Sequence, residues 1–349
     1  MSHAVREGWV GSGRGVMSGA VSSLVKAEAA RRPVRQRING LLLLDKALGV
    51  SSNHALQQVK RLYCAAKAGH GGTLDPLASG LLPVAFGEAT KFLHALLDAD
   101  KCYTARIVLG RSSSTGDAEG QLSQWIDPRP MRGAVEQALD RLRTSTQQIP
   151  PMYSALKREG VALYRLARQG LEVDRSVRNV RIHRFDMLDM VECELAGLPM
   201  LQLGVFVHCS KGTYVRVLAE DLGAMLGCGA HLTDLRRTRI GQLTPDRMLG
   251  LQELQSLDPA RRREVLLPVD HLIHHLPRVD LGAELAERFN RGQRLRLPAS
   301  AVVEASGEVS QVRVYGARSH LLGTGVLDAT GRLAPQRLVS SDVPQSSSA

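Results

Sequence analysis

One carboxylate stands out as a candidate for chemistry, because Asp75 is the only acidic residue in the glycine-rich stretch GHGGTLDPLASGLLPVAFG from Gly69 to Gly87. Pro76 biases the residue before it toward an extended backbone, and the glycines permit turns and close approaches that other residues resist. An ionised carboxylate held in such a loop can act as a nucleophile or can stabilise a reacting group. The pattern alone is equally compatible with an aspartate that only caps a turn.

The segments around this loop must position it. Apolar runs and alternation predict strands at 38–45, 81–86, 103–109 and 201–207, and helical spacing predicts helices at 53–63, 90–97 and about 213–226. Together these elements predict a mixed α+β core, with the Asp75 loop between the first helix and the second strand. Beyond residue 277, short apolar segments separated by glycine turns predict a smaller β-rich domain.

Extended to GHGGTLDPLASGLLPVAFGEATKF, the Asp75 stretch resembles the catalytic motif of the TruB family of pseudouridine synthases. Further blocks match in the same order along the chain: INGLLLLDKALGVSSN, DKCYTARIVLG, STGDAEG, IPPMYSALKREGVALYRLARQG, HCSKGTYVRVLAEDLG and GCGAHLTDLRRTRIG. The chain departs from the family where Gly71 replaces a threonine, and where Ala47 and Leu48 replace a proline and a variable residue. None of these departures removes a reactive group.

The resemblance implies an enzyme that converts uridine to pseudouridine at position 55 in the T loop of tRNA, with Asp75 acting on a flipped-out base. The reaction exchanges the bond from ribose C1′ to base N1 for one from C1′ to C5, so no cofactor is expected. Three routes stay open for Asp75, namely attack on C1′, addition to C6, or removal of the C2′ proton to give a glycal-like intermediate. We favour the glycal route.

The resemblance also assigns roles to residues that spacing alone would leave as ordinary structure. Tyr103 matches the tyrosine that stacks on the flipped base, although a strand tyrosine more often fills a core. Arg216 matches the arginine that pairs with the carboxylate and keeps it ionised, whereas its spacing alone would suggest an exposed helix arginine. Tyr214 and Leu235 match pocket walls, and a core role suits their spacing equally well.

Three further residues gain a role only through the resemblance. His70 is expected to insert into the T loop and to fill space left by flipped nucleotides, although a lone histidine in a glycine-rich loop is more often a surface residue. Lys46 and Lys91 flank the site in sequence and could contact phosphate. For Lys46, support of the Asp75 loop is the alternative.

Positive charge is unevenly distributed. The net charge is +11, of which residues 1–37 and residues 153–184 each carry +5, which leaves +1 elsewhere. Such clustering fits a polyanionic partner. The second segment resembles the insertion with which the family grips the RNA stem, and its basic residues would lie along phosphates. These residues are Lys157, Arg158, Arg165 and Arg168. The alternative is that they only form a solvent-exposed helix face without a binding role.

Composition and resemblance together predict the organisation of the chain. We expect a basic, disordered leader (1–37), a pseudouridine synthase catalytic domain (38–272) with an RNA-gripping insertion at about 150–184, a PUA-like RNA-binding domain (277–340) and a disordered tail (341–349). The leader could also be a transit peptide or an extension upstream of a true start at Met17. Its role stays open.

The cysteines and the apolar runs indicate the cellular compartment. The five cysteines form no CxxC pair and no metal-ligand spacing with histidine, so a reducing compartment and no metal are expected. No apolar run is long enough to span a membrane. The prediction is a cytoplasmic monomer that acts on tRNA without an obligate protein partner. Its competitors are a non-catalytic RNA-binding or tRNA-folding protein of the same fold, and a synthase that modifies ribosomal RNA within a guide-RNA complex.

Overall fold

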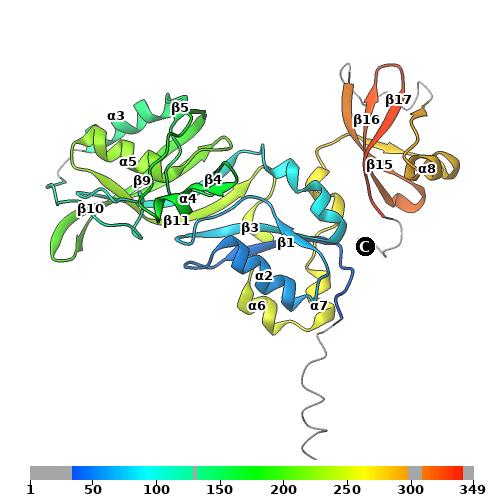
Figure 1. Cartoon of the computed structure of the whole chain (residues 1–349), viewed down its shortest axis with the longest axis horizontal. Coiled ribbons are helices and arrows are strands. Elements are labelled where there is room, and N and C mark those ends of the chain that lie inside the picture. Colours follow the sequence, from blue (N-terminus) through cyan, green and yellow to red (C-terminus); the bar gives the residue numbers. More distant parts are fainter. Residues whose placement is uncertain (1–33, 129–131, 298–308, 341–349) are drawn as a thin grey trace, which may run out of the picture. The chain divides into compact units, whose positions relative to one another are not determined.

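The computed structural model describes residues 34–128, 132–297 and 309–340, and Figure 1 traces the elements in these ranges. Most of the expected basic leader and the whole expected tail lie outside the described residues. Within the described part of the chain, no helix is both long and apolar enough to cross a bilayer.

The first two elements match the expected strand and helix. β1 (Gly40–Lys46) contains the run of four leucines, all buried, and α2 (Ser52–Leu62) follows after a short turn. The helix begins where the Ser51 side chain accepts a hydrogen bond from the backbone N–H of His54. This bond satisfies one of the free N–H groups of the first helical turn.

The larger part of the chain is built on one mixed sheet of eight strands, which confirms the expected α+β core. Seven strands follow the order β12–β1–β3–β11–β4–β10–β9, and β2 pairs with β3 beside this path. β3 is parallel to β11 and β1 to β12, whereas the other neighbours are antiparallel. The bounds are β2 (Ala68–His70), β3 (Ala78–Phe86), β4 (Lys101–Leu109), β9 (Ile182–Leu195), β10 (Leu198–Cys209), β11 (Ala230–Ile240) and β12 (Leu249–Gly250).

Two helices cover the part of this sheet that contains β9 and β11. α3 (Arg132–Arg143) and α5 (Val215–Leu226) pack against each other, α3 against β9 and α5 against β11 (Figure 1). α5 ends at Gly227, whose φ of +76° is the left-handed conformation that favours glycine at a helix terminus. Apolar side chains of α2, α3, α5 and the sheet form one hydrophobic core.

The helix expected at 90–97 is present, but it is of the tighter 3₁₀ type. The segment forms a 3₁₀ helix, η1 (Gly87–Leu96). Side chains three residues apart lie directly above one another in a 3₁₀ helix. This spacing suits the ion pair between Lys91 and Glu88, whose Nζ and Oε2 atoms lie 2.6 Å apart.

The helical spacing of the expected insertion is misleading. The segment contains a short hairpin in which β6 (Lys157–Arg158) pairs with β7 (Val161–Ala162). A five-residue helix, α4 (Leu163–Ala167), follows it. Glu159 and Gly160, which connect the hairpin strands, have φ values of +51° and +83°, as a tight primed turn requires. Flanking this region, β5 (Gln147–Gln148) pairs with β8 (Arg178–Asn179).

The last part of the chain forms the expected small β-rich domain. Its sheet has the order β13–β15–β16–β17–β14, and α8 packs against β14 and β16. Their apolar side chains form a hydrophobic core separate from that of the eight-stranded sheet. The bounds are β13 (Arg278–Asp280), α8 (Ala283–Asn290), β14 (Leu295–Arg296), β15 (Val309–Tyr315), η5 (Ala317–Ser319), β16 (Leu321–Asp328) and β17 (Arg332–Leu338). Between β11 and this domain lie η2 (Pro245–Arg247), α6 (Leu251–Ser256), α7 (Pro259–Glu264) and η3 (Val269–Ile273).

Candidate active site

The sheet places the Asp75 loop beside the first residues of β4. Asp75 lies in the connection from β2 to β3, and its carbonyl oxygen accepts a hydrogen bond from the N–H of Ala78 at 3.0 Å. Because β11 pairs with both β3 and β4, its register aligns Gly80, Arg237 and Tyr103 in one row. Gly80 has a φ of +94°, and a Cβ there would clash with the Arg237 carbonyl oxygen, so glycine is required.

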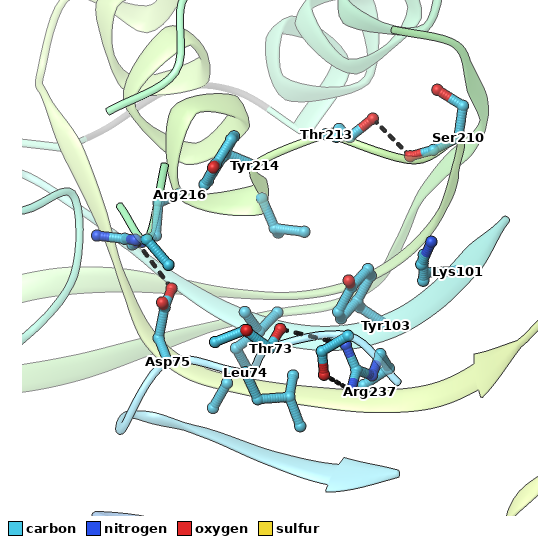
Figure 2. Close-up of a pocket in the computed structure, with 16 residues that line it drawn as sticks. Thr73, Leu74, Asp75, Lys101, Tyr103, Ser210, Thr213, Tyr214, Arg216 and Arg237 are labelled. Atoms are coloured by element: carbon cyan, nitrogen blue, oxygen red, sulfur yellow. Dashed lines mark hydrogen bonds and ion pairs between the residues drawn. The ribbon is translucent and has the colours of Figure 1, made fainter. Parts of the chain in front are cut away.

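Arg216 contacts the carboxylate of Asp75. It lies in the first turn of α5, and its side chain is only 5% exposed. Its Nη2 atom lies 2.9 Å from Oδ2 of Asp75 and donates to the Tyr153 carbonyl oxygen at 2.7 Å. Figure 2 shows the two side chains meeting at the pocket. The exposed helix arginine that spacing alone suggests is therefore wrong.

A second carboxylate, Asp117, faces the same guanidinium. Its side chain is 3% exposed, and its Oδ2 atom lies 3.4 Å from Nη1 of Arg216. Its Oδ1 atom accepts hydrogen bonds from the Thr115 hydroxyl at 2.6 Å and from the Glu119 N–H at 3.1 Å. Arg216 thus joins a fixed, buried carboxylate to the more exposed one of Asp75. The STGDAEG block is the only sequence signal for Asp117, and it does not reveal this contact.

The surroundings of Asp75 shift its protonation. Burial raises the pKa of Asp75 above its ordinary value, while the Arg216 guanidinium favours the ionised form and opposes that rise. The carboxylate of Asp117 acts in the same direction as burial. Because the net shift is upward, Asp75 takes up a proton at a higher pH than a free aspartate, and its charge depends on Arg216.

Arg237 is a buried cation that sequence reasoning missed. It is 1% exposed, and its Nε atom donates to the Leu81 carbonyl oxygen at 2.9 Å. Its Nη2 atom donates to the Gly72 carbonyl oxygen at 3.1 Å, so it fixes the backbone on both sides of the Asp75 loop. The one sequence signal is strand alternation, because Arg237 follows the inward-facing Leu235 by two residues in β11.

Lys46 also supports this loop. It is 1% exposed, and its Nζ atom donates to the carbonyl oxygens of Val50 at 2.5 Å and Pro76 at 3.4 Å. Burial lowers the pKa of Lys46 to about 8, although the charge of Asp75 acts in the opposite direction. Of its two expected roles, these contacts correspond to loop support, and burial keeps the ammonium from a phosphate at the surface.

A small pocket opens beside Asp75. It encloses about 200 Å³, less than the roughly 300–1,000 Å³ of common small-molecule sites, so it suits one inserted group. Tyr103 and Tyr214 line it together with Asp75 and Arg216 (Figure 2). Leu235 is also part of the lining. The structure therefore gathers these five residues, which are distant in the sequence, around one cavity.

The two tyrosines of this pocket are neutral and held in place. Burial raises the pKa of Tyr103 to about 12, against the opposing charge of Arg237, so its hydroxyl stays protonated at neutral pH. That state favours stacking over action as an ionised base. Burial also raises the pKa of Tyr214, whose backbone N–H donates to Oε1 of Gln148 at 2.8 Å.

A second pocket, of about 500 Å³, shares Asp75 and Arg216 with the first. His70 and Arg168 also line it. Burial lowers the pKa of His70, and its Nδ1 atom is buried with no hydrogen-bond partner among the described residues. Arg168 is exposed and lies over the ring of Tyr164, 5.5 Å from the ring centroid. A neutral imidazole and an exposed cation thus face the space next to Asp75.

Four other expected RNA contacts line neither of these pockets. Lys91 pairs with Glu88 in η1. It lines neither of the two pockets that contain Asp75. Lys157 and Arg158 line a different pocket within the insertion, and Arg165 is exposed. The structure therefore does not bring Lys91 to the site, and it leaves the other three as an exposed basic surface.

One group among the described residues could hold a metal ion, although the cysteine spacing predicts no such site. It consists of Asp100, His183 and His208, none of which lines the Asp75 pockets. Sequence patterns carry no signal for it, because its members come from separate segments and no cysteine takes part.

Models of three protein families match consecutive parts of the chain. The TruB family pseudouridylate synthase N-terminal domain matches residues 60–215, and the tRNA pseudouridylate synthase B C-terminal domain matches residues 216–274. The pseudouridine synthase II TruB C-terminal model matches residues 277–339, which contain the five-stranded sheet.

Relatives and solved structures agree with these matches. A tRNA pseudouridine synthase B of Cupriavidus taiwanensis is 50% identical over 317 residues, which cover 89% of this chain and 98% of that protein. One of Burkholderia lata is 52% identical over 316 residues, with coverages of 89% and 94%. A chain of a solved Cbf5–Nop10–Gar1 complex shares the fold, with a TM-score of 0.62 and 24% identity over 86% of this chain and 84% of its own.

Proposed function

This chain belongs to the TruB family of pseudouridylate synthases, and we propose that Asp75 is its catalytic carboxylate. The chain converts uridine to pseudouridine at position 55 in the T loop of tRNA. The contact of Asp75 with the buried Arg216 at 2.9 Å, in a pocket that Tyr103 also lines, carries the assignment.

The chemistry needs a charged group at the ribose while the base is detached. The bond between N1 and C1′ breaks, C1′ joins C5, C5 loses a proton and N1 gains one, so there is no net oxidation. A carboxylate can attack C1′, add to C6 of the base, or help to remove the C2′ proton, and we favour the last route. Arg216 would keep Asp75 ionised in a buried setting, and the neutral ring of Tyr103 would hold the uracil by stacking.

Access to this pocket requires base flipping, because a cavity of about 200 Å³ admits one base and not a folded loop. His70 lines the adjoining pocket, and it would enter the T loop as the uridine leaves its stack. The exposed side chains of Lys157, Arg158 and Arg165, with Arg168 at the pocket, would follow the RNA backbone.

We also propose the organisation and setting of the enzyme. Residues 38–272 would form the catalytic domain, with the insertion at about 150–184, and residues 277–340 would form a PUA-like domain that adds RNA contacts. A monomer without an obligate protein partner is what the family resemblance implies. A reaction on tRNA without redox chemistry supports a cytoplasmic setting.

The test is single-turnover conversion of an unmodified T-arm stem-loop in excess EDTA. We expect the intact protein to form pseudouridine, because no step of the proposed chemistry uses a metal ion. Asp75→Asn keeps the size of the side chain but removes its charge. It should bind RNA normally and lower the rate by about 10⁴-fold or more, the order seen when a reactive group is removed.

Asp98→Asn is the matched control, since Asp98 is an exposed carboxylate paired with Lys211 and lines neither pocket. It should react at the wild-type rate. Near wild-type conversion by Asp75→Asn would remove the assignment of Asp75. Binding without product by the intact protein would instead favour the non-catalytic RNA-binding alternative.

A further inference from the structure

Three side chains from different segments converge outside the lining of the Asp75 pockets. Asp100 precedes β4, His183 is the second residue of β9, and His208 is near the end of β10. Their ligand atoms all lie within 4.8 Å of one another. We propose that these residues, here called the Asp100 cluster, bind a divalent transition-metal ion of the Zn²⁺ class.

A β-bulge brings the two histidines together. His208 pairs with Arg184, whereas the next residue, Cys209, pairs with Ile182, so His183 is the extra residue between these pairs. A bulge of this kind redirects a side chain that regular alternation would place elsewhere. His183 and Arg184 are both exposed, and buried neighbours flank His208 in β10, so the bulge presents His183 on the same outer face as His208.

The distances fit a metal ion after small side-chain rotations. Nε2 of His183 lies 3.1 Å and Nε2 of His208 lies 3.8 Å from Oδ2 of Asp100. Bonds of about 2.0–2.1 Å to a tetrahedral Zn²⁺ ion place its ligand atoms about 3.3–3.4 Å apart. Two imidazoles and one carboxylate suit Zn²⁺, and a water molecule would complete the shell at this half-exposed surface.

The local charges decide how strong such a site can be. The rings of His183 and His208 lie with their centroids 4.5 Å apart, and two arginines lie close enough to act on them. One arginine, Arg184, is neutralised by Asp186, since its Nε atom lies 2.9 Å from Oδ2 of that residue. The other, Arg239, donates to the Gly241 carbonyl oxygen and is the main charge that opposes a bound cation.

A bound ion would connect the insertion to the reaction pocket. His183 is the second residue of β9, the strand that leaves the insertion, and Asp100 lies three residues before Tyr103. Binding to the folded chain would therefore stabilise it and restrain the start of β9 against β4. The inference is independent of the proposed reaction, because no member of the cluster lines the Asp75 pockets.

The test uses the full chain after removal of metals by a chelator. Calorimetric titration with Zn²⁺ should show one site, and hydrogen exchange of residues 182–185 should slow when Zn²⁺ is present. Loss of one ligand in His208→Ala should weaken binding by more than about 100-fold, since even changes to supporting groups around metal ligands cost 10–100-fold. Both the calorimetric signal and the exchange protection should then disappear.

His274→Ala is the matched control. Its Nε2 atom lies 3.5 Å from Asp270, and its ring lies beside His271, but the Asp270 carboxylate also accepts the Tyr315 hydroxyl. This variant should bind Zn²⁺ as the wild type does. If His208→Ala fails to fold, Arg239→Gln tests the same site in the opposite direction, because removing the opposing charge should tighten binding.

Three results would overturn the proposal. The first is the absence of saturable Zn²⁺ binding by the intact chain. The second is binding that Arg239→Gln does not tighten and His208→Ala does not weaken. The third is a thiolate charge-transfer band when Co²⁺ replaces Zn²⁺, because such a band would place the ion on a cysteine instead of the Asp100 cluster.

Discussion

The Asp75 pocket and the insertion at 150–184 use positive charge in opposite ways. Around Asp75, the guanidinium groups of Arg216 and Arg237 and the ammonium of Lys46 are almost completely buried. All three donate to backbone carbonyl oxygens at fixed distances. In the insertion, by contrast, Lys157, Arg158 and Arg165 are exposed on a short hairpin and a five-residue helix.

This difference gives the two proposed roles, chemistry in the pocket and RNA binding in the insertion, separate physical bases. A buried charge interacts strongly with its partner but is costly if the partner is removed. An exposed charge is screened by salt and contributes little through any single ion pair. We therefore expect substitutions in the pocket to change the chemical step, and substitutions in the insertion to change only the affinity for RNA.

The largest effect in this comparison after Asp75 is expected at Arg216. Arg216→Gln leaves Asp117 as an uncompensated buried charge, so the free energy of unfolding should fall by about 3–5 kcal/mol in denaturant titration. The same change removes the charge that opposes the raised pKa of Asp75. The proposed chemistry requires the ionised carboxylate, so the acid limb of the pH–rate profile should move to higher pH.

A second arginine–aspartate pair provides the control. Nη2 of Arg236 lies 2.7 Å from Oδ2 of Asp45, but the side chains of these residues are 37% and 31% exposed. Arg236→Gln removes both hydrogen bonds of this bidentate pair, so it should cost about 1 kcal/mol, the upper end for partly exposed pairs, and leave the acid limb in place. Equal effects of the two substitutions would show that burial does not distinguish the pocket from the surface. Restoring the acid limb with Arg216→Lys would support the electrostatic cause.

A smaller effect is expected at Tyr103. Tyr103→Phe keeps the ring, so it should bind RNA normally and retain the stacking energy, whereas Tyr103→Ala should lose roughly 1–3 kcal/mol. The pKa of about 12 indicates that the hydroxyl is not an ionised base, so the Phe variant should also release product.

Single-turnover assays of the Phe and Ala variants separate these cases. A Phe variant that traps an intermediate would give the hydroxyl a role in proton transfer, and equal rates for Phe and Ala would discard both roles.

Local chemistry made part of this site predictable. The glycines and Pro76 mark the Asp75 loop, and alternation in β4 predicts where Tyr103 lies. The order of strands in the sheet is not predictable from such patterns, because it depends on contacts between distant segments. The row that joins Gly80, Arg237 and Tyr103 exists only because β11 lies between β3 and β4.

The failures have the same origin. A buried arginine and an exposed one look identical in a helical pattern, so spacing alone placed Arg216 on the surface although it is 4% exposed. The pattern of the insertion is helical, yet few of its apolar side chains are buried to stabilise a long helix. His183 joins His208 through a bulge, which shifts the register and cannot be found by counting residues.

The smallest effect on the chemical step is expected in the insertion. Alanine at Lys157, Arg158, Arg165 and Arg168 should weaken tRNA binding and lower the slope of log K against log salt by about 1 for each phosphate that is no longer neutralised. The single-turnover rate at saturating RNA should stay unchanged, because only Arg168 lines a pocket with Asp75. The control is alanine at the three exposed arginines of α3, Arg132, Arg141 and Arg143, which line neither pocket and should leave the slope unchanged. An unchanged slope in the four-site variant would show that these residues do not follow the backbone, and a large fall in rate would place the insertion within the chemistry.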